Sequence, residues 1–308
     1  MLNTKPKLPL SREAQAILDG EWPRLPLIDF SNAELIKPIK EVVNDGYRIL
    51  SETSYQECNI DKDNIGGVDC CWIYPKGALK KDLIVYIPGG GGIFGCPETH
   101  YSIAMALSFA TKCRVLSVNY PKAPEHPYPE PQNAVEAVYS TITNKEPSSS
   151  VSLVADSFGA SLAINLILRL RSQRIKSPNS LALICPFVDF DYAGDSYQSL
   201  CGIDPSWDNS EVIKSITSAH IANTKTSDPM LNVLNSDFHG FPHTFIQAAS
   251  RDLILSDSIQ LQKKLLSSEI NVEYELWEGL WHDFHANQSV PEAREATDAI
   301  AKFINHHI

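Results

Sequence analysis

The sequence alternates short apolar runs with longer segments of helical periodicity, and this alternation constrains the fold more than any other feature. The runs are rich in β-branched residues and mostly continuous, which is typical of strands that helices cover on both faces. Apolar runs lie at 68–74, 83–88, 114–119, 151–155, 181–185, 244–247 and 272–276. Helical segments lie at about 98–111, 131–143, 158–173, 257–268 and 291–306. The alternation predicts an α/β fold with a mostly parallel, doubly wound sheet.

Two segments interrupt this alternation, at 1–45 and at 187–240, and both contain helical patterns. A doubly wound sheet has no place for either segment within its layers. We expect both to cover the carboxyl edge of the sheet, where ligands bind in such folds. Residues 1–45 are therefore predicted to be an N-terminal helical cap segment. Residues 46–308 are predicted to be the main domain, with 187–240 as a cap insert; the alternative is that both segments only pack peripherally.

A serine stands between one of these strands and the helical segment that follows it, in VSLVADSFGAS at 151–161. A strand–serine–helix turn holds the serine in a strained backbone conformation and exposes its hydroxyl above the sheet. Ala155 and Gly159, two positions before and after Ser157, are small, as the close approach of strand and helix requires. Ser157 is therefore a candidate nucleophile, and a serine that only caps a helix is the alternative.

Four consecutive glycines at 89–92 directly follow another apolar run. Glycines can direct backbone N–H groups into a cavity with no side chain in the way, and such donors can stabilise an oxyanion. Together with Gly95, the run also satisfies the GxGxxG fingerprint of dinucleotide-binding proteins. That fingerprint requires an acidic residue at the end of the next strand, where this chain has Asn119. A dinucleotide-dependent oxidoreductase is therefore disfavoured.

Two aspartates and two histidines follow the last two strands. Asp252 lies at a strand end, where it can reach a histidine, whereas Asp257 is better placed to cap the next helix. His282 and His285 lie in the loop before the last helix. Ser157, Asp252 and His282 follow the chain order Ser, Asp, His, which is that of the α/β-hydrolase triad and differs from the trypsin and subtilisin orders.

Several motifs resemble those of the hormone-sensitive-lipase-like carboxylesterases of the α/β-hydrolase superfamily, from about residue 60 to the end. YIPGGGGIFG at 86–95 is similar to YxHGGGxxxG, NYPKAPEHPYP at 119–129 to YRLAPEHPFP, and ADSFGASLA at 155–163 to GDSAGGxLA. DPML at 228–231, GFPHTFIQAASRDLILSD at 240–257 and EGLWHDF at 278–284 complete the resemblance.

The resemblance implies an α/β-hydrolase fold, with a sheet of about eight strands and a helical cap. It also implies an esterase that cleaves carboxylic esters of small or medium acyl size through an acyl-enzyme, without a metal or an organic cofactor. The implied triad is Ser157, Asp252 and His282, and the implied oxyanion donors are the N–H groups of Gly90, Gly91 and Phe158. The alternatives are a lactone or short-amide hydrolase on the same triad, or a non-catalytic small-molecule receptor.

The sequence departs from the family motifs beside the glycine run. Pro88 stands where the family has a histidine, and Gly92 stands where it has an aromatic residue. Proline fixes its own φ and lacks an N–H, so Pro88 is expected to stiffen the start of the glycine loop. Gly92 is expected to enlarge the pocket wall.

Charge and cysteine content exclude several other classes. The chain carries 37 acidic and 26 basic residues, a formal charge of -11, which disfavours a nucleic-acid partner. It has neither an apolar run of about 20 residues nor the apolar core of a signal peptide, so membrane insertion is not expected. Seven cysteines without a CxxC pair indicate reduced thiols in a cytoplasmic protein and no zinc site. A small-molecule ester is the expected partner, and a homo-oligomer is compatible with the sequence.

Overall fold

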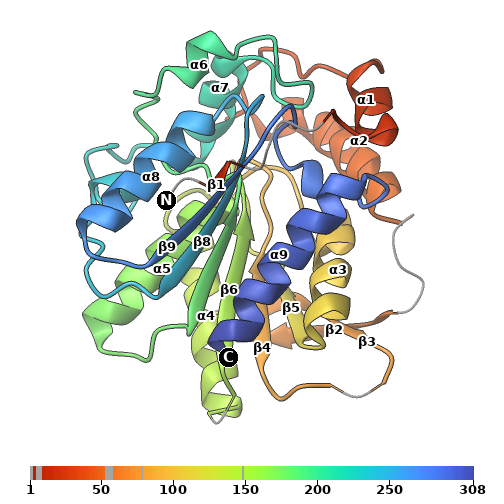
Figure 1. Cartoon of the computed structure of the whole chain (residues 1–308). Helices are drawn as coiled ribbons and strands as arrows, with labels where there is room; N and C mark the ends of the chain where they lie inside the picture. Colours follow the sequence, from red (N-terminus) through yellow and green to blue (C-terminus); the bar gives the residue numbers. More distant parts are fainter. Residues whose placement is uncertain (1–2, 5–8, 53–57, 78, 148) are drawn as a thin grey trace.

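The computed structural model describes residues 3–4, 9–52, 58–77, 79–147 and 149–308 (Figure 1). Its strands are β1 (Asn3–Thr4), β2 (Cys58–Ile65), β3 (Val68–Pro75), β4 (Leu83–Ile87), β5 (Arg114–Val118), β6 (Val151–Asp156), β7 (Ser180–Ile184), β8 (His243–Ala249) and β9 (Val272–Trp277). They form one sheet in the order β1-β9-β8-β7-β6-β4-β5-β3-β2. Within the described chain, only the β2–β3 and β3–β5 pairs are antiparallel. The predicted mostly parallel α/β sheet is confirmed.

Two strands of this sheet were not predicted. β1 has only two residues, and β2 has the polar sequence CNIDKDNI, most of which is exposed. β2 is an edge strand that forms a hairpin with β3, in which Ile65 pairs with Val68. The two-residue turn between them consists of Gly66 and Gly67, both at positive φ (62° and 85°). Such a turn matches the twist of a hairpin and is open chiefly to glycine, asparagine and aspartate.

Helices cover both faces of the sheet (Figure 1). They are α1 (Arg12–Leu18), α2 (Ala33–Glu52), α3 (Tyr101–Thr111), α4 (Glu130–Lys145), α5 (Gly159–Gln173), α6 (Ser196–Ser199), α7 (Ser210–Ile221), α8 (Leu255–Ser267) and α9 (Pro291–His307). Short 3-10 segments lie at Pro97–His100, Val233–Asn235 and Phe284–Ala286. One apolar cluster packs α4, α5 and α8 on one face of the sheet, and a second packs α3 and α9 on the other. No helix in the described part of the chain is both long and apolar enough to cross a bilayer.

Helices α1, α2, α6 and α7 gather at one end of the molecule (Figure 1). A third apolar cluster joins α2 and the segment before it to α7, because Phe30 and Ile36 pack with Val212 and Ile216. The two segments that interrupt the strand–helix alternation are therefore in contact. α2 runs without a break through the predicted boundary at residue 45. Residues 1–2 and 5–8 of the predicted N-terminal segment lie outside the described residues.

Candidate active site

Ser157 occupies the tight turn between the end of β6 and the start of α5. Its backbone φ is 49°, in the left-handed region that non-glycine residues rarely adopt, so the predicted strained conformation is confirmed. Gly159 lies so close to β4 that a Cβ atom there would be 2.1 Å from the carbonyl oxygen of Ile87. This contact explains why the position two residues after the serine must be glycine.

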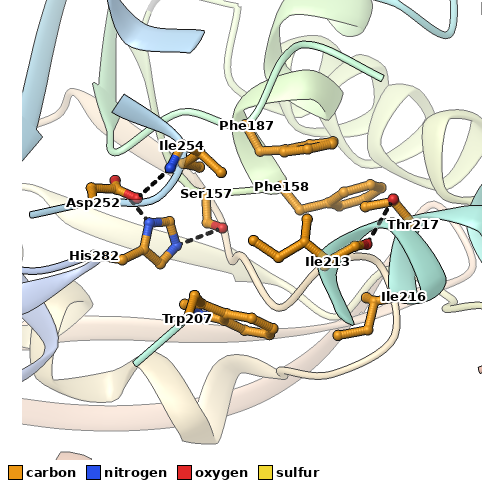
Figure 2. A pocket seen from close by; sticks show the side chains of 11 residues that line it. Ser157, Phe158, Phe187, Trp207, Ile213, Ile216, Thr217, Asp252, Ile254 and His282 are labelled. Atoms are coloured by element: carbon orange, nitrogen blue, oxygen red, sulfur yellow. Dashed lines mark hydrogen bonds and ion pairs between the residues drawn. The ribbon is translucent and has the colours of Figure 1, made fainter. Parts of the chain in front are cut away.

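The structure brings Ser157, His282 and Asp252 together in one hydrogen-bonded series (Figure 2). The Nε2 atom of His282 lies 2.9 Å from Ser157 Oγ, and its Nδ1 atom lies 2.9 Å from Asp252 Oδ2. The other carboxylate oxygen of Asp252 accepts the backbone N–H of Ile254 at 3.0 Å. All three side chains are buried and follow β6, β8 and β9, at the carboxyl edge where sequence reasoning predicted them.

His282 is surrounded by more carboxylates than the sequence predicted. Burial alone would lower its pKa, but the carboxylates of Asp252 and Asp283 raise the pKa of His282 well above its usual range. Asp204 is buried and accepts the backbone N–H of His282 at 3.1 Å. Burial and the charge of Asp252 raise the pKa of Asp204 to about 6. Asp283 directly follows His282, so the sequence could have predicted that its carboxylate lies near the histidine. Asp204 lies 78 positions away, and nothing in the sequence indicates its contact with His282.

Three backbone N–H groups near Ser157 have no acceptor among the described residues: those of Gly90, Gly91 and Phe158. Gly90 and Gly91 have φ values of 105° and 64°, which glycine adopts without strain. The three groups are therefore free to bind an oxygen atom of a ligand.

A buried network behind the glycine loop holds its start in place. Asp156 accepts the backbone N–H of Gly89 at 2.9 Å and the hydroxyl of Tyr86. The Nε2 atom of His100 lies 3.3 Å from Asp156 Oδ2. Burial disfavours the charged form of both side chains, but their mutual attraction outweighs it. His100 lowers the pKa of Asp156, and Asp156 raises the pKa of His100. The loop that follows Pro88 is thus braced by hydrogen bonds that the sequence did not reveal.

The pocket beside Ser157 is narrow and mostly apolar (Figure 2). In Figure 2, Phe158 and Phe187 lie on one side of it and Trp207 on the other. Its other walls come from Gly91, Ile213, Ile216, Thr217, Asp252, Ile254 and His282. The free volume is about 30 Å³.

The expectation that Gly92 enlarges the pocket is wrong. A Cβ atom at Gly92 would lie 2.8 Å from Cζ of Phe158, so the Phe158 ring already fills this space. The ring is fully buried and makes an edge contact with His220 at a centroid distance of 4.7 Å. The Phe158 ring, which follows the nucleophile, therefore fills the space that an aromatic residue at position 92 fills in the family motif.

The expectation that Asp257 caps a helix is also wrong. Asp257 lies inside α8, and one of its carboxylate oxygens accepts the backbone N–H groups of Val188 and Asp189 at 2.8 and 2.9 Å. The other oxygen accepts the hydroxyl of Tyr197 at 3.0 Å. Burial raises the pKa of Asp257 well above its usual range. Asp257 thus anchors the beginning of the 187–240 segment to α8.

His285 lies apart from the Ser157 series. Its Nε2 atom is 2.9 Å from Gln247 Oε1, and the side chain is fully buried. Burial lowers the pKa of His285 to about 3, which keeps the ring neutral. The structure therefore gives His285 a packing role.

In the described part of the chain, one group of at least three potential metal ligands occurs, formed by Cys185, His282 and Asp283. One ligand atom from each lies within 4.8 Å of the other two. The His282 Nε2 and Asp283 Oδ2 atoms are 3.1 Å apart and already contact each other, and burial raises the pKa of the Cys185 thiol. We assign no metal to this group.

The fold and the site define an α/β hydrolase, and the comparisons agree. The family model for the α/β-hydrolase fold matches residues 84–286, and the chain belongs to this family. It is 31% identical over 229 residues to an esterase of Acinetobacter venetianus, covering 73% of this chain and 75% of that protein. It is 26% identical over 246 residues to an acetyl-hydrolase of Streptomyces hygroscopicus, with coverages of 79% and 82%.

A crystal structure of an esterase from the bacterial hormone-sensitive lipase family has the same fold. It superposes with a TM-score of 0.86 at 23% identity, covering 98% of this chain and 100% of the other. The structure confirms the fold, and the family match together with the esterase relative confirms the predicted placement in the α/β-hydrolase superfamily.

Proposed function

We propose that the protein is a carboxylesterase that transfers a small acyl group to Ser157 and then to water. The observation that carries this proposal is the series Ser157–His282–Asp252, with both hydrogen bonds at 2.9 Å. A nucleophile, a base and a residue that orients the base, in hydrogen-bond contact, are the features that activate a serine. A receptor without catalytic activity would not require this geometry.

In the proposed mechanism, His282 Nε2 accepts the proton of Ser157 as Oγ attacks the ester carbonyl carbon. The free N–H groups of Gly90, Gly91 and Phe158 bind the resulting oxyanion. The tetrahedral intermediate then collapses, and His282 returns the proton to the departing alcohol. Water, activated by the same nitrogen, attacks the acyl-enzyme and releases the acid.

The pocket supports a short acyl group, at the small end of the range predicted from the sequence. The small cavity volume, about 30 Å³, and the aromatic walls Phe158, Phe187 and Trp207 favour a short acyl group over a long one. The acetyl-hydrolase relative from Streptomyces hygroscopicus fits this inference. We therefore propose acetate esters as the preferred class.

Two further features belong to the proposed function, a cap over the pocket and a cytoplasmic location. We propose that residues 1–45 and 187–240 form the cap and that residues 46–308 otherwise form the catalytic domain. Trp207, Ile213 and Ile216 of the second segment line the pocket, and Phe30 of the first packs on this segment. None of the seven cysteines forms a disulfide with a described residue, which supports a cytoplasmic protein.

The test combines a covalent probe with a panel of esters. A fluorophosphonate should label the wild-type chain once, at Ser157, and Ser157→Ala should remove both the label and ester hydrolysis. Acetate, butyrate and hexanoate esters of one alcohol should give values of kcat/KM that fall with acyl length. Labelling at another residue, or turnover by Ser157→Ala, would refute the assignment of the nucleophile.

A further inference from the structure

Asp283 places a second carboxylate on the catalytic side of His282. Its backbone is left-handed, with φ at 51°, and its side chain turns back so that Oδ2 lies 3.1 Å from His282 Nε2. The same nitrogen lies 2.9 Å from Ser157 Oγ. Nε2 has a single position for a proton or a hydrogen bond, so Asp283 and Ser157 compete for it.

Asp283 has no other described partner that would neutralise its charge. Its side chain is 20% exposed, and its Oδ1 atom is buried without a hydrogen bond to any described residue. Burial raises the pKa of Asp283 to about 7, although the positive charge of His282 opposes this shift. The pair is therefore poised to retain one proton near neutral pH.

Half of the titratable groups around the His282–Asp283 pair are carboxylates. They come from the end of β6, from the segments that follow β7, β8 and β9, from the 187–240 segment, and from α2 and the 3-10 segment before α3. They are Asp156, Cys185, Asp252, Asp283, His285, Asp204, Tyr47 and His100. His100 is already paired with Asp156, and burial keeps His285, Cys185 and Tyr47 neutral. Three carboxylates, Asp204, Asp252 and Asp283, thus favour a proton on His282.

We propose that Asp283 is a positioning residue that retains a proton at His282 Nε2 and thereby sets the pH above which His282 can act as base. This inference rests on the proposed function. The shared proton is held either as an imidazolium N–H that donates to Oδ2 or as a carboxylic O–H that donates to Nε2. Both forms occupy the nitrogen that must accept the proton of Ser157. Activity begins when this proton is lost to solvent.

The sign of the effect follows from the charge. A carboxylate beside Nε2 stabilises the protonated pair, so removing it lowers the pH at which Nε2 becomes free. An opposite charge at this separation typically shifts a pKa by about 1 to 3 units. The acid limb of kcat/KM should therefore move to lower pH by about 1 to 3 units when Asp283 is replaced.

The test is the pH profile of Asp283→Gly, because glycine tolerates the left-handed backbone at this position. Initial rates of phenyl acetate hydrolysis would be measured from pH 5 to pH 10 for this variant and for the wild type. Asp283→Asn, which keeps the shape of the side chain, is a second variant, and thermal unfolding reports whether each is folded. Glu278→Gln is the matched control, because Glu278 is an exposed carboxylate on the same loop and its removal should leave the limb in place.

A second readout separates the role of the base from the rest of turnover. The rate at which a fluorophosphonate labels Ser157 depends on His282 as base but involves no ester, and its acid limb should move by the same amount. Unchanged limbs in folded Asp283→Gly, or an equal shift in Glu278→Gln, would overturn the inference while ester hydrolysis persists. If the wild type neither hydrolyses esters nor is labelled, the proposed function fails and this inference fails with it.

Discussion

Replacing Phe158 by alanine should change the acyl length that the pocket accepts. The buried ring occupies the space between Gly92 and His220, and the backbone N–H that we propose binds the oxyanion is retained in the variant. Two further methylenes of a butyryl group could then be buried, each contributing about 0.8 kcal/mol. Their sum of about 1.6 kcal/mol predicts a rise of roughly 15-fold in the ratio of kcat/KM for butyrate to that for acetate.

The assay is steady-state hydrolysis of the acetate and butyrate esters of one alcohol. Loss of a buried phenylalanine ring typically costs about 3–5 kcal/mol, so the free energy of unfolding must be measured on the same samples. Phe303→Ala is the matched control. Phe303 is also a buried phenylalanine, but it packs on Phe245 in the apolar cluster on the opposite face of the sheet. An unchanged ester ratio in folded Phe158→Ala, or the same change in Phe303→Ala, would refute the reasoning.

Four further outcomes are expected. Asp257→Asn should leave kcat unchanged and lower the free energy of unfolding by about 1–3 kcal/mol, measured by urea denaturation, because a buried hydrogen-bond network is disturbed. His285→Ala should likewise reduce stability rather than kcat; inactivity of the folded variant would contradict its packing role. Pro88→Ala should lower kcat with little change in KM, since the proposed oxyanion donors Gly90 and Gly91 act mainly in the transition state. Equal kcat values in the variant and the wild type would show that Pro88 does not position the glycine loop. EDTA should leave kcat unchanged, and a loss that added Zn²⁺ restores would contradict metal-free chemistry.

The parallel strands and the candidate triad could be predicted because each depends on local sequence. Apolar runs predicted the central strands, and Ser157, Asp252 and His282 each follow such a run, so their common position at the carboxyl edge followed from the topology. β2 could not be predicted because its sequence, CNIDKDNI, is polar and lies on an exposed edge of the sheet. Neither its periodicity nor its composition indicates a strand. Its pairing with β3 is set by the turn at Gly66 and Gly67.

The surroundings of the site could not be predicted because they depend on contacts between distant residues. Asp204 reaches His282 across 78 positions, and His100 reaches Asp156 only after β6 and the 3-10 segment before α3 are in place. Phe158 and Gly92 compensate for each other in volume, which no single motif reveals. The sequence shows that Asp257 lies near the start of a helix, which favours a cap. It does not show the distant groups that Asp257 binds, which lie at 188–197.

The contact between the N-terminal segment and α7 lies outside the sheet, so the site has two sets of positions with separate consequences. Reactivity depends on side chains at the ends of β-strands, whose replacement also disturbs the most deeply packed part of the sheet. Under the proposed function, selectivity depends largely on the pocket residues Trp207, Ile213 and Ile216, which lie on a segment outside the sheet layers. We therefore expect substitutions in that segment to retune the range of accepted esters without touching the strand ends, so that this scaffold can acquire new substrates while its reaction stays the same.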